Sequence, residues 1–148
     1  MKIPARSTTN FIKDPSVSCV LLYGPDQGLV IERSNDLRTN ILGEGLPDPF
    51  CYSELTVSII SNDPAVLVDE AAALSFTGGR RVIRISNSTD GLTAAIAKVL
   101  SSREQISNLD DSLIIVESGD LGPRSTLRQL FEKSKSGATI PCYAEDIN

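Results

Sequence analysis

The sequence predicts an α/β fold in which helices cover both faces of a mostly parallel β-sheet, giving three layers. Short apolar runs of strand length alternate along the 148 residues with longer segments in which apolar residues recur every three or four positions. The segments between the strands are long enough to form the right-handed helical crossovers that parallel strands require. A domain of this length buries about 70% of its unfolded surface, so it needs no disulfide or metal.

Five segments are expected to form the strands of this sheet. Residues 17–23 are a continuous apolar run, which is typical of a central strand buried on both faces. Residues 50–55 alternate poorly and form the weakest of the five strand patterns. The remaining strands are expected at residues 82–85, 112–116 and 138–143.

Four helices are expected between these strands, because apolar residues recur at helical spacing there. The helix that starts at residue 63 is the best signalled, with Asp63 as a candidate N-cap and Pro64 at the first helical position. The four segments are residues 29–41, residues 63–74, a helix opening at Asp90 or Thr93 and running to residue 100, and residues 122–135.

Glycines mark several of the expected helix ends. Gly43 and Gly45 follow the first helix, and Gly78 and Gly79 follow the second, where either permits the backbone to leave the helical conformation. The last helix is expected to open at Gly122-Pro123 and to end at Gly137. We therefore expect one domain over residues 1–148.

Composition excludes several classes of function. The chain has 14 basic and 19 acidic residues and a net charge of -5, which argues against gripping DNA phosphates by charge alone but allows docking on a protein. No apolar run is long enough for a membrane helix, and residues 1–10 lack the apolar core of a signal peptide, so a cytoplasmic protein is expected.

The side chains that usually carry hydrolase chemistry are missing. Cys19, Cys51 and Cys142 are odd in number and far apart, so we interpret them as free thiols. The chain has no histidine, which removes the commonest general base and metal ligand and every Ser-His or Cys-His pair. Ordinary hydrolase chemistry is therefore not expected.

A turn between the first strand and the first helix is typical of a place where nucleotide phosphates bind. It comprises Gly24, Pro25, Asp26, Gln27 and Gly28. Counted from Gly24, however, the lysine of a phosphate-binding loop falls on Val30 and the hydroxyl residue on Ile31. Neither side chain can hold a phosphate or a magnesium ion, so this position predicts a degenerate phosphate loop and no cofactor.

An enzymatic alternative remains open for the same turn. A divergent phosphotransferase or ATPase would bind nucleotide at the helix N-terminus and hold a metal with Glu117 or Asp120. A metal site built from Asp26, Glu117 and Asp120 is conceivable, because the carboxyl ends of parallel strands share one edge, but solvated loop acids are favoured and no metal is expected. A receiver-type signalling module ranks last, because Glu117 occupies the clearest place for its acceptor aspartate.

Four motifs carry a resemblance to a known family. They are Leu-Tyr-Gly-Pro-Asp at 22–26 with Glu32, Leu-Ser-Phe-Thr-Gly-Gly-Arg-Arg-Val at 74–82, Leu-Ile-Ile-Val-Glu-Ser-Gly-Asp at 113–120 followed by Leu127-Arg128, and Ile-Pro-Cys-Tyr at 140–143. In this order and spacing they resemble the N-terminal domain of the delta subunits of the bacterial DNA polymerase III clamp loader, over about residues 17–143.

This resemblance implies the fold of the AAA+ ATPases, a P-loop NTPase or RecA-like fold, without a functional phosphate loop. It implies that residues 1–148 are a fragment whose lid and helical collar domains are absent. It further implies a non-catalytic accessory subunit of the polymerase holoenzyme, which binds the sliding clamp (the beta subunit) and helps open its ring. The other implied partners are the gamma/tau and delta prime subunits, with primed DNA reached only through the assembled complex.

The resemblance also implies which residues contact the clamp. In the family, two adjacent large apolar residues at the end of the helix after the second strand enter a pocket on the clamp, and that place corresponds here to Leu74, Ser75 and Phe76. Phe76 matches the aromatic member, whereas Ser75 departs from the pattern, so the apolar partner is either absent or supplied by Leu74. Spacing alone favours Phe76 as a core residue under the Gly78-Gly79 turn, and the resemblance favours docking.

Three neighbouring residues are secondary candidates for contacts with the clamp or with another subunit. They are Thr77, Arg80 and Arg81. For the two arginines the residue types alone favour a solvated pair beside the sheet.

Overall fold

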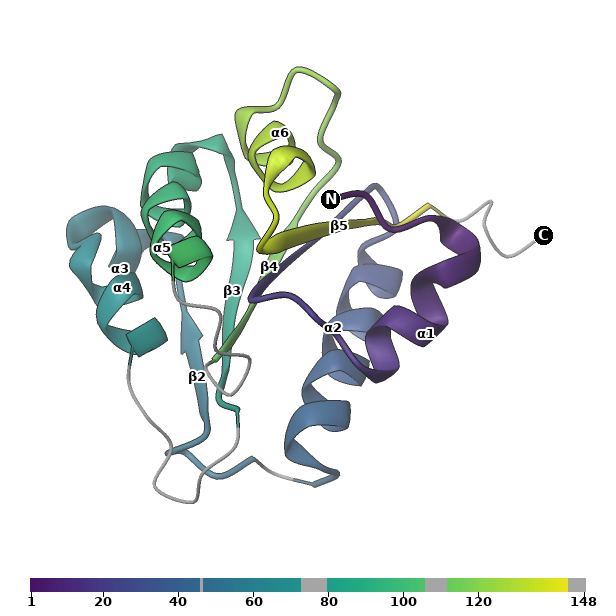
Figure 1. The fold of residues 1–148 in the computed structure, drawn as a ribbon, viewed down its shortest axis with the longest axis horizontal. Coiled ribbons are helices and arrows are strands. Elements are labelled where there is room, and N and C mark those ends of the chain that lie inside the picture. Colours follow the sequence, from purple (N-terminus) through teal and green to yellow (C-terminus); the bar gives the residue numbers. More distant parts are fainter. Residues whose placement is uncertain (46, 73–79, 106–111, 144–148) are drawn as a thin grey trace.

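The computed structural model describes residues 1–45, 47–72, 80–105 and 112–143, and it contains a five-stranded sheet between two layers of helices (Figure 1). The strands lie in the order β2-β3-β4-β1-β5, and every pairing between them is parallel. They are β1 (Cys19–Tyr23), β2 (Tyr52–Leu55), β3 (Val82–Ser88), β4 (Leu113–Ser118) and β5 (Gly137–Pro141). The predicted α/β fold class is confirmed.

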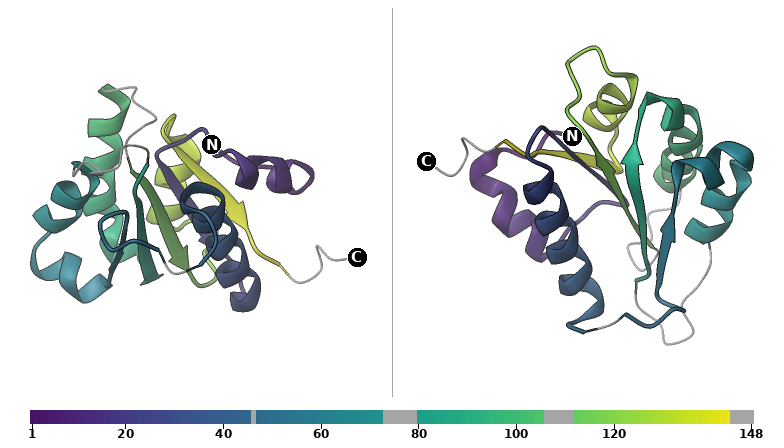
Figure 2. Two further views of the ribbon diagram at one scale, coloured as in Figure 1. Left: turned by 90° about the horizontal axis from the view of Figure 1, so that it is seen from below. Right: turned by 180° about the vertical axis from the view of Figure 1, so that it is seen from behind.

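Helices cover both faces of the sheet (Figure 2). Helices α1 (Thr8–Lys13) and α2 (Gln27–Leu42) pack on one face. The other face is covered by α3 (Val57–Asn62), α4 (Ala65–Ala72), α5 (Thr93–Gln105) and α6 (Thr126–Lys133). Among the described residues, no helix is long and apolar enough to cross a bilayer.

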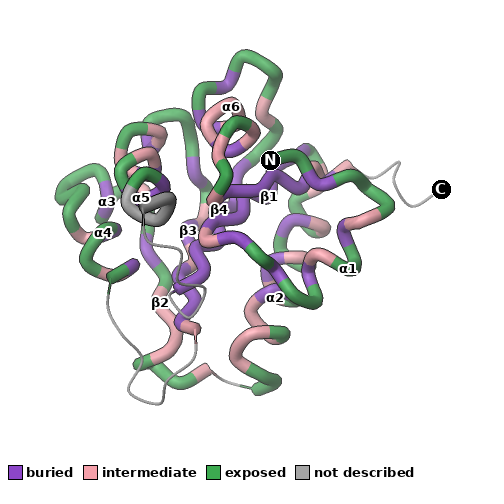
Figure 3. The backbone as a smooth tube through the Cα atoms, in the orientation of Figure 1, coloured by how far each residue is buried: buried purple, intermediate pink, exposed green. Residues whose placement is uncertain are grey.

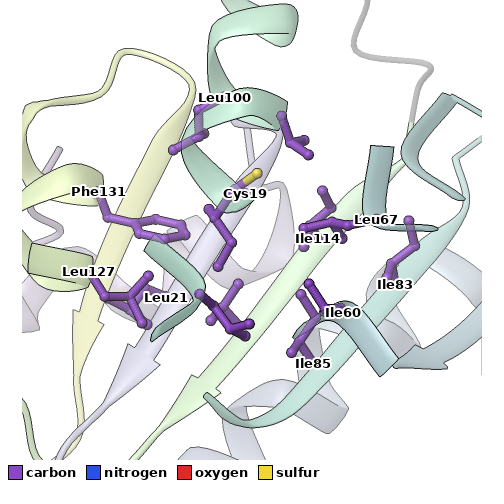
Figure 4. Packing of buried hydrophobic residues seen from close by; sticks show 14 of the residues in the cluster. Cys19, Leu21, Ile60, Leu67, Ile83, Ile85, Leu100, Ile114, Leu127 and Phe131 are labelled. Carbon is purple, nitrogen blue, oxygen red and sulfur yellow. The ribbon is translucent and has the colours of Figure 1, made fainter. Parts of the chain in front are cut away.

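The sheet separates two apolar cores because successive side chains of a strand point to opposite faces. In β1, Leu21 packs with Ile114 and Phe131 in the core under α3 to α6 (Figure 4). Its neighbour Leu22 packs with Leu37 in the core under α1 and α2. All five residues of β1 are buried, as expected for a central strand, whereas the helices are buried on one side only (Figure 3).

The turn after β1 leads into α2 earlier than predicted. Helix α2 begins at Gln27, two residues before the expected start, because the Asp26 carboxylate caps it by accepting a hydrogen bond from the Leu29 N–H at 3.1 Å. The helix ends at Gly43, whose φ of 88° lies in the left-handed region. The predicted stop at Gly43 is confirmed.

The segment between β2 and β3 holds two helices where the sequence predicted one. Helix α3 was missed because six residues are too few to show a clear period; Thr56 caps it by accepting a hydrogen bond from the Ile59 N–H at 3.1 Å. Asp63 opens α4 as predicted, accepting a hydrogen bond from the Ala65 N–H at 3.2 Å. The last two residues of the predicted helix, 73 and 74, lie outside the described residues.

Helix α6 is shorter than predicted at both ends. It begins at Thr126 and not at Gly122-Pro123, because Ser125 caps it and accepts a hydrogen bond from the Arg128 N–H at 3.2 Å. It ends at Lys133, and Gly137 opens β5 where the prediction had it end the helix. A Cβ at Gly137 would lie 3.0 Å from the Phe131 ring, so the close packing of α6 on β5 favours glycine there.

The sequence left Asp90 and Thr93 as alternative starts of the third helix, and each begins a helical segment. Asp90–Leu92 is a 3-10 turn, and α5 follows from Thr93. The strands differ from prediction mainly at their ends: β3 continues to Ser88, and β5 stops at Pro141. The three cysteines are thiols and form no disulfide, as predicted.

The N-terminal residues form structure that the sequence did not predict. A 3-10 turn (Ala5–Ser7) and α1 precede β1, and Lys2 pairs in parallel with Thr139 of the edge strand β5. The Ile3 N–H donates to the Thr139 carbonyl at 3.0 Å, and the Thr139 N–H donates to the Met1 carbonyl at 2.8 Å. This segment covers the open edge of β5 and limits its pairing with other chains.

One carboxylate holds α6 against the start of α5. Asp90 Oδ1 accepts hydrogen bonds from Ser125 Oγ at 2.5 Å and from the Leu127 N–H at 3.1 Å. We expect Asp90→Ala to lower the free energy of unfolding by about 1–2 kcal/mol, because it leaves the first turn of α6 without this acceptor. Urea denaturation measures the loss, with Asp36→Ala on the exposed side of α2 as control; equal stability of the two variants would contradict the assignment.

Candidate functional site

The turn after β1 is closed by the chain that follows β5. Gly24 has a φ of 145°, and a Cβ there would clash with the carbonyl group of Cys142. The Asp26 N–H donates to the same Cys142 carbonyl at 3.3 Å, and the Gly24 N–H donates to the Gly119 carbonyl at 3.1 Å. Close packing of the backbone therefore accounts for the glycine that the phosphate-loop interpretation emphasised.

Several of the groups that would bind a phosphate at this turn are already occupied. A phosphate-binding loop presents backbone N–H groups and a helix N-terminus to the anion. Here the Leu29 N–H is taken by the Asp26 carboxylate, which also places a negative charge at the N-terminus of α2. The Gln27 side chain donates to the Gly24 carbonyl at 2.8 Å and to the Ser118 carbonyl at 3.0 Å, so it ties the turn to β4.

The position of the missing lysine is part of the core. Val30 is completely buried with Leu22 and Leu37 between α2 and the sheet, so a lysine there would need burial of its charge. Ile31 is 46% exposed on the outer side of α2. Every contact that the described residues show for the turn at residues 24–28 therefore serves to hold the fold together.

Glu117, the acid expected at the end of the third strong strand, is not solvated. It is 5% exposed and accepts two hydrogen bonds from Arg84 of the neighbouring strand, from Nε at 2.5 Å and from Nη2 at 3.2 Å. Burial acts to lower the pKa of Arg84, but the hydrogen bonds and charge of Glu117, together with Tyr52, outweigh it, and the pKa lies above its usual value. The expectation of a solvated acid is wrong for Glu117, because Arg84 supplies its counter-charge inside the protein.

The other two acids of the conceivable metal site lie apart from this pair. Asp26 caps α2, and the exposed Asp120 accepts a hydrogen bond from the Tyr143 hydroxyl at 3.4 Å. In the described part of the chain, no three or more His, Cys, Asp or Glu side chains gather where they could hold a metal ion.

The predicted clamp-contact residues Leu74, Ser75, Phe76 and Thr77 lie outside the described residues. The structure describes what flanks them: the end of α4 on one side, and Arg80, Arg81 and the start of β3 on the other. Strands β2 and β3 run in register from Tyr52 and Val82, so both begin at the same edge of the sheet, at the lower end in Figure 1. We call this the amino edge.

Arg81 joins three elements at the amino edge. Its guanidinium donates from Nη1 to the Glu70 carbonyl in α4 at 2.7 Å and from Nε to the Phe50 carbonyl just before β2 at 3.0 Å. Nη2 donates to the Glu70 carboxylate at 3.1 Å and to Ser53 Oγ at 3.3 Å. Arg81 is 7% exposed, so the alternative of a solvated arginine is wrong at this position.

Arg80 and Ser112 make two further side-chain contacts at the amino edge, one with the segment before β1 and one with α4. Arg80 donates to the Pro15 carbonyl at 3.0 Å and to the Val17 carbonyl at 2.8 Å, which fixes the segment that leads into β1. Ser112 Oγ donates to the Ala71 carbonyl at 3.0 Å. Two of the last carbonyls of α4 thereby receive side-chain donors, which satisfy groups that have no partner within the helix.

Sequence reasoning did not find the pairs Arg84–Glu117 and Arg81–Glu70. The signal for the first was present, because each strand carries a charged residue next to an apolar run, and such charges require partners when the strands are buried. No comparable signal pointed to Glu70, whose partner becomes visible only when α4 and β3 are placed side by side.

Comparison with known proteins identifies related chains. The family model described as DNA polymerase III, delta subunit, matches residues 20–142. No curated protein matches the chain in sequence. The Bacillus subtilis DNA clamp loader delta protein has a similar structure, with a TM-score of 0.67 and 17% identity over 94% of this chain and 42% of that one.

A second solved structure, a DNA polymerase III gamma subunit-related protein from Thermotoga maritima, gives a TM-score of 0.60 and 14% identity. That match covers 95% of this chain and 46% of the Thermotoga chain. At these identities the two structures show that the fold is shared. The present chain spans less than half the length of either.

The Arg84–Glu117 pair makes a prediction about stability. Arg84→Met leaves a buried, uncompensated carboxylate, so we expect the free energy of unfolding to fall by about 3 kcal/mol, and the double variant Arg84→Met/Glu117→Leu to recover most of that loss. Urea denaturation of both variants tests this, with Arg124→Met at an exposed position as control. If the double variant were as unstable as Arg84→Met, the loss of stability would not come from the unpaired Glu117 carboxylate.

Proposed function

The chain belongs to the DNA polymerase III delta-subunit family, and from this premise we propose that it is a non-catalytic clamp-loader subunit that binds the sliding clamp and helps open its ring. Because the chain spans less than half of each structural relative, we assign it the N-terminal AAA+-like domain. The lid and collar domains then belong to the rest of the protein. In the full-length protein these domains assemble with the gamma/tau and delta prime subunits in the cytoplasm. Primed DNA is contacted only through the assembled complex.

The single observation that carries the proposal is the extent of the family match. It runs over residues 20–142 and so includes both flanks of the segment in which the resemblance expects the clamp contact. A match confined to the strand and turn at residues 19–28 would support a nucleotide-binding fold of any kind. A match across the amino edge supports the function of the delta subunit in particular.

The carboxyl edge of the sheet supports the non-catalytic part of the proposal. Its helix N-terminus is capped by Asp26, its lysine position is the buried Val30, and its strand-end acid Glu117 is paired with Arg84. Phosphoryl transfer requires cations that neutralise the developing charge on the phosphate oxygens. Arg84, the cation beside the strand-end acid Glu117, is already neutralised by it.

In the proposed mechanism Phe76 is the anchor that enters an apolar pocket on the clamp. Burying an aromatic ring removes on the order of 200 Å² from water, worth several kcal/mol at roughly 25 cal/mol per Å². Arg81 and Ser112 hold the end of α4, and Arg81 and Arg80 hold the approach to β3. Fixed flanks reduce the entropy that the contact segment loses on binding.

We expect Phe76→Ala to weaken binding of the chain to purified sliding clamp by about 30-fold, since truncation of an aromatic hot spot costs about 2 kcal/mol. Isothermal titration calorimetry measures the affinity. The matched control is Ile31→Ala, which truncates an exposed apolar side chain on α2, beside the opposite face of the sheet. Equal affinities of the Phe76→Ala variant and the unmodified chain would remove Phe76 from the site.

The chain is not expected to bind Mg-ATP, because the N–H groups of Gly24, Asp26 and Leu29 are taken and a carboxylate occupies the helix N-terminus. Calorimetric titration with Mg-ATP should give only heats of dilution, and the melting temperature should not rise with ATP concentration. Saturable binding of Mg-ATP would favour the phosphotransferase alternative.

A further inference from the structure

A cavity of about 380 Å³ lies where β1 and β5 end, between α6 and the N-terminal segment that pairs with β5. Its size is at the lower end of the range for pockets that hold small molecules, roughly 300–1,000 Å³. Open sheets of parallel strands bind their ligands at this carboxyl edge. The polar lining of the cavity comes from Tyr23 and Thr139 of the two strands, Arg128 and Glu132 of α6, and Lys2.

Two hydroxyl groups of buried residues line this cavity. Tyr23 is 3% exposed and Thr139 is 1% exposed. The Thr139 side chain points to the α6 side of the sheet, because its neighbours Ala138 and Ile140 belong to the core under α1 and α2. In the described part of the chain, neither hydroxyl has a hydrogen-bond partner. Buried polar groups nearly always have one, so these two hydroxyls are available to a molecule in the cavity.

The Tyr23 hydroxyl is a hydrogen-bond donor at neutral pH. Burial raises the pKa of Tyr23 above its ordinary value, and the charge of Arg128 opposes this only in part. The Arg128 guanidinium lies over the Tyr23 ring, 5.0 Å from its centroid. It is held there because it donates to Glu132 at 3.0 Å and to the Leu121 carbonyl at 2.9 Å. The ring and the cation above it therefore form a fixed wall.

The cavity carries an excess of positive charge. Of the described residues that line it, Lys2 and Arg128 are basic, and Glu132 is the only acid. Both cations share the Glu132 carboxylate, whose Oε2 lies 3.0 Å from Arg128 Nε and 3.9 Å from Lys2 Nζ. The Lys2 side chain is 70% exposed, so its long ion pair contributes little and its ammonium group can turn to another anion. One positive charge is thus left for a ligand.

The rest of the lining is apolar. It comes from Ile3, Pro4 and Ala5 of the N-terminal segment and from Pro141 at the end of β5. The Ile3 N–H donates to the Thr139 carbonyl at 3.0 Å, which ties this apolar wall to the strand that carries the Thr139 hydroxyl. Apolar walls with a few convergent polar groups are typical of sites for small organic molecules.

We propose that this cavity binds a small organic monocarboxylate. Its carboxylate accepts hydrogen bonds from the Tyr23 and Thr139 hydroxyls and pairs with Lys2, and its apolar body lies against Pro4 and Pro141. A single negative charge matches the one uncompensated cation, whereas a phosphate group would bring nearly two. Hydroxyls donate more strongly to a charged acceptor than to a neutral one, so the site favours a carboxylate over an alcohol. The site is separate from the amino edge and does not depend on the proposed function.

Benzoate is the probe, because it joins one carboxylate to an apolar ring. We expect a dissociation constant of about 1 mM, since a ligand with so few atoms gains little binding energy. Titration of the ¹⁵N-labelled chain, followed by amide chemical shifts, measures the affinity and should shift the residues that line the cavity. Benzyl alcohol, the neutral counterpart, should bind about tenfold more weakly.

Two variants remove the hydroxyls and keep the shapes of the side chains. We expect Tyr23→Phe and Thr139→Val each to weaken benzoate binding about tenfold. Their melting temperatures should stay within a few degrees of the unmodified chain, because neither hydroxyl is hydrogen-bonded within the described fold. The matched control is Thr39→Val on α2, which packs on the opposite face of the sheet and should leave benzoate binding unchanged.

Several results would overturn the inference. One is the lack of saturation by benzoate at about 10 mM. Another is unchanged affinity of both hydroxyl variants, because benzoate would then bind elsewhere on the chain. If benzyl alcohol bound as tightly as benzoate, or inorganic phosphate bound more tightly, the assignment to a monocarboxylate would be wrong.

Discussion

The buried guanidinium of Arg81 is the interaction on which the amino edge of the sheet depends. A cation that is 7% exposed requires partners for its donors, and here they come from Glu70, Ser53 and the Phe50 carbonyl. These partners belong to α4, β2 and the turn before β2, while Arg81 itself directly precedes β3. Loss of the guanidinium would remove a donor from the Glu70 carboxylate and from two backbone carbonyls, so one side chain connects four parts of the chain.

At the carboxyl edge of the sheet, where the parallel strands end, charged and polar side chains also bond within the protein. In open parallel sheets this edge usually binds ligands, with donors and cations directed outward. Here Asp26 and Gln27 bond to backbone groups of their own turn and of β4, and Glu117 pairs with Arg84 inside the sheet. Polar groups in the place where an active enzyme would bind a nucleotide therefore serve as internal contacts in this protein.

The sequence predicted the five strands and their parallel arrangement because apolar runs and helix-sized connections are local signals. Predicted helix boundaries were wrong where the deciding contact is distant in sequence. The start of α6, for example, depends on Asp90, which hydrogen-bonds Ser125 from 35 residues earlier in the chain. Arg84–Glu117 and Arg81–Glu70 were missed for the same reason, since each pair joins neighbouring elements. Phe50 was placed inside a strand, although β2 begins only at Tyr52, so its exposure was not foreseen. Residues 74–77 stay a prediction from resemblance.

Arg81 fixes the turn before β2 relative to the end of α4, since its guanidinium donates to the Phe50 carbonyl at 3.0 Å and to the Glu70 carbonyl at 2.7 Å. A planar group with several fixed donors holds two such carbonyls in one arrangement, which a single flexible ammonium group would not do. A load applied at the end of α4 would therefore be shared with β2 and β3 through this one side chain.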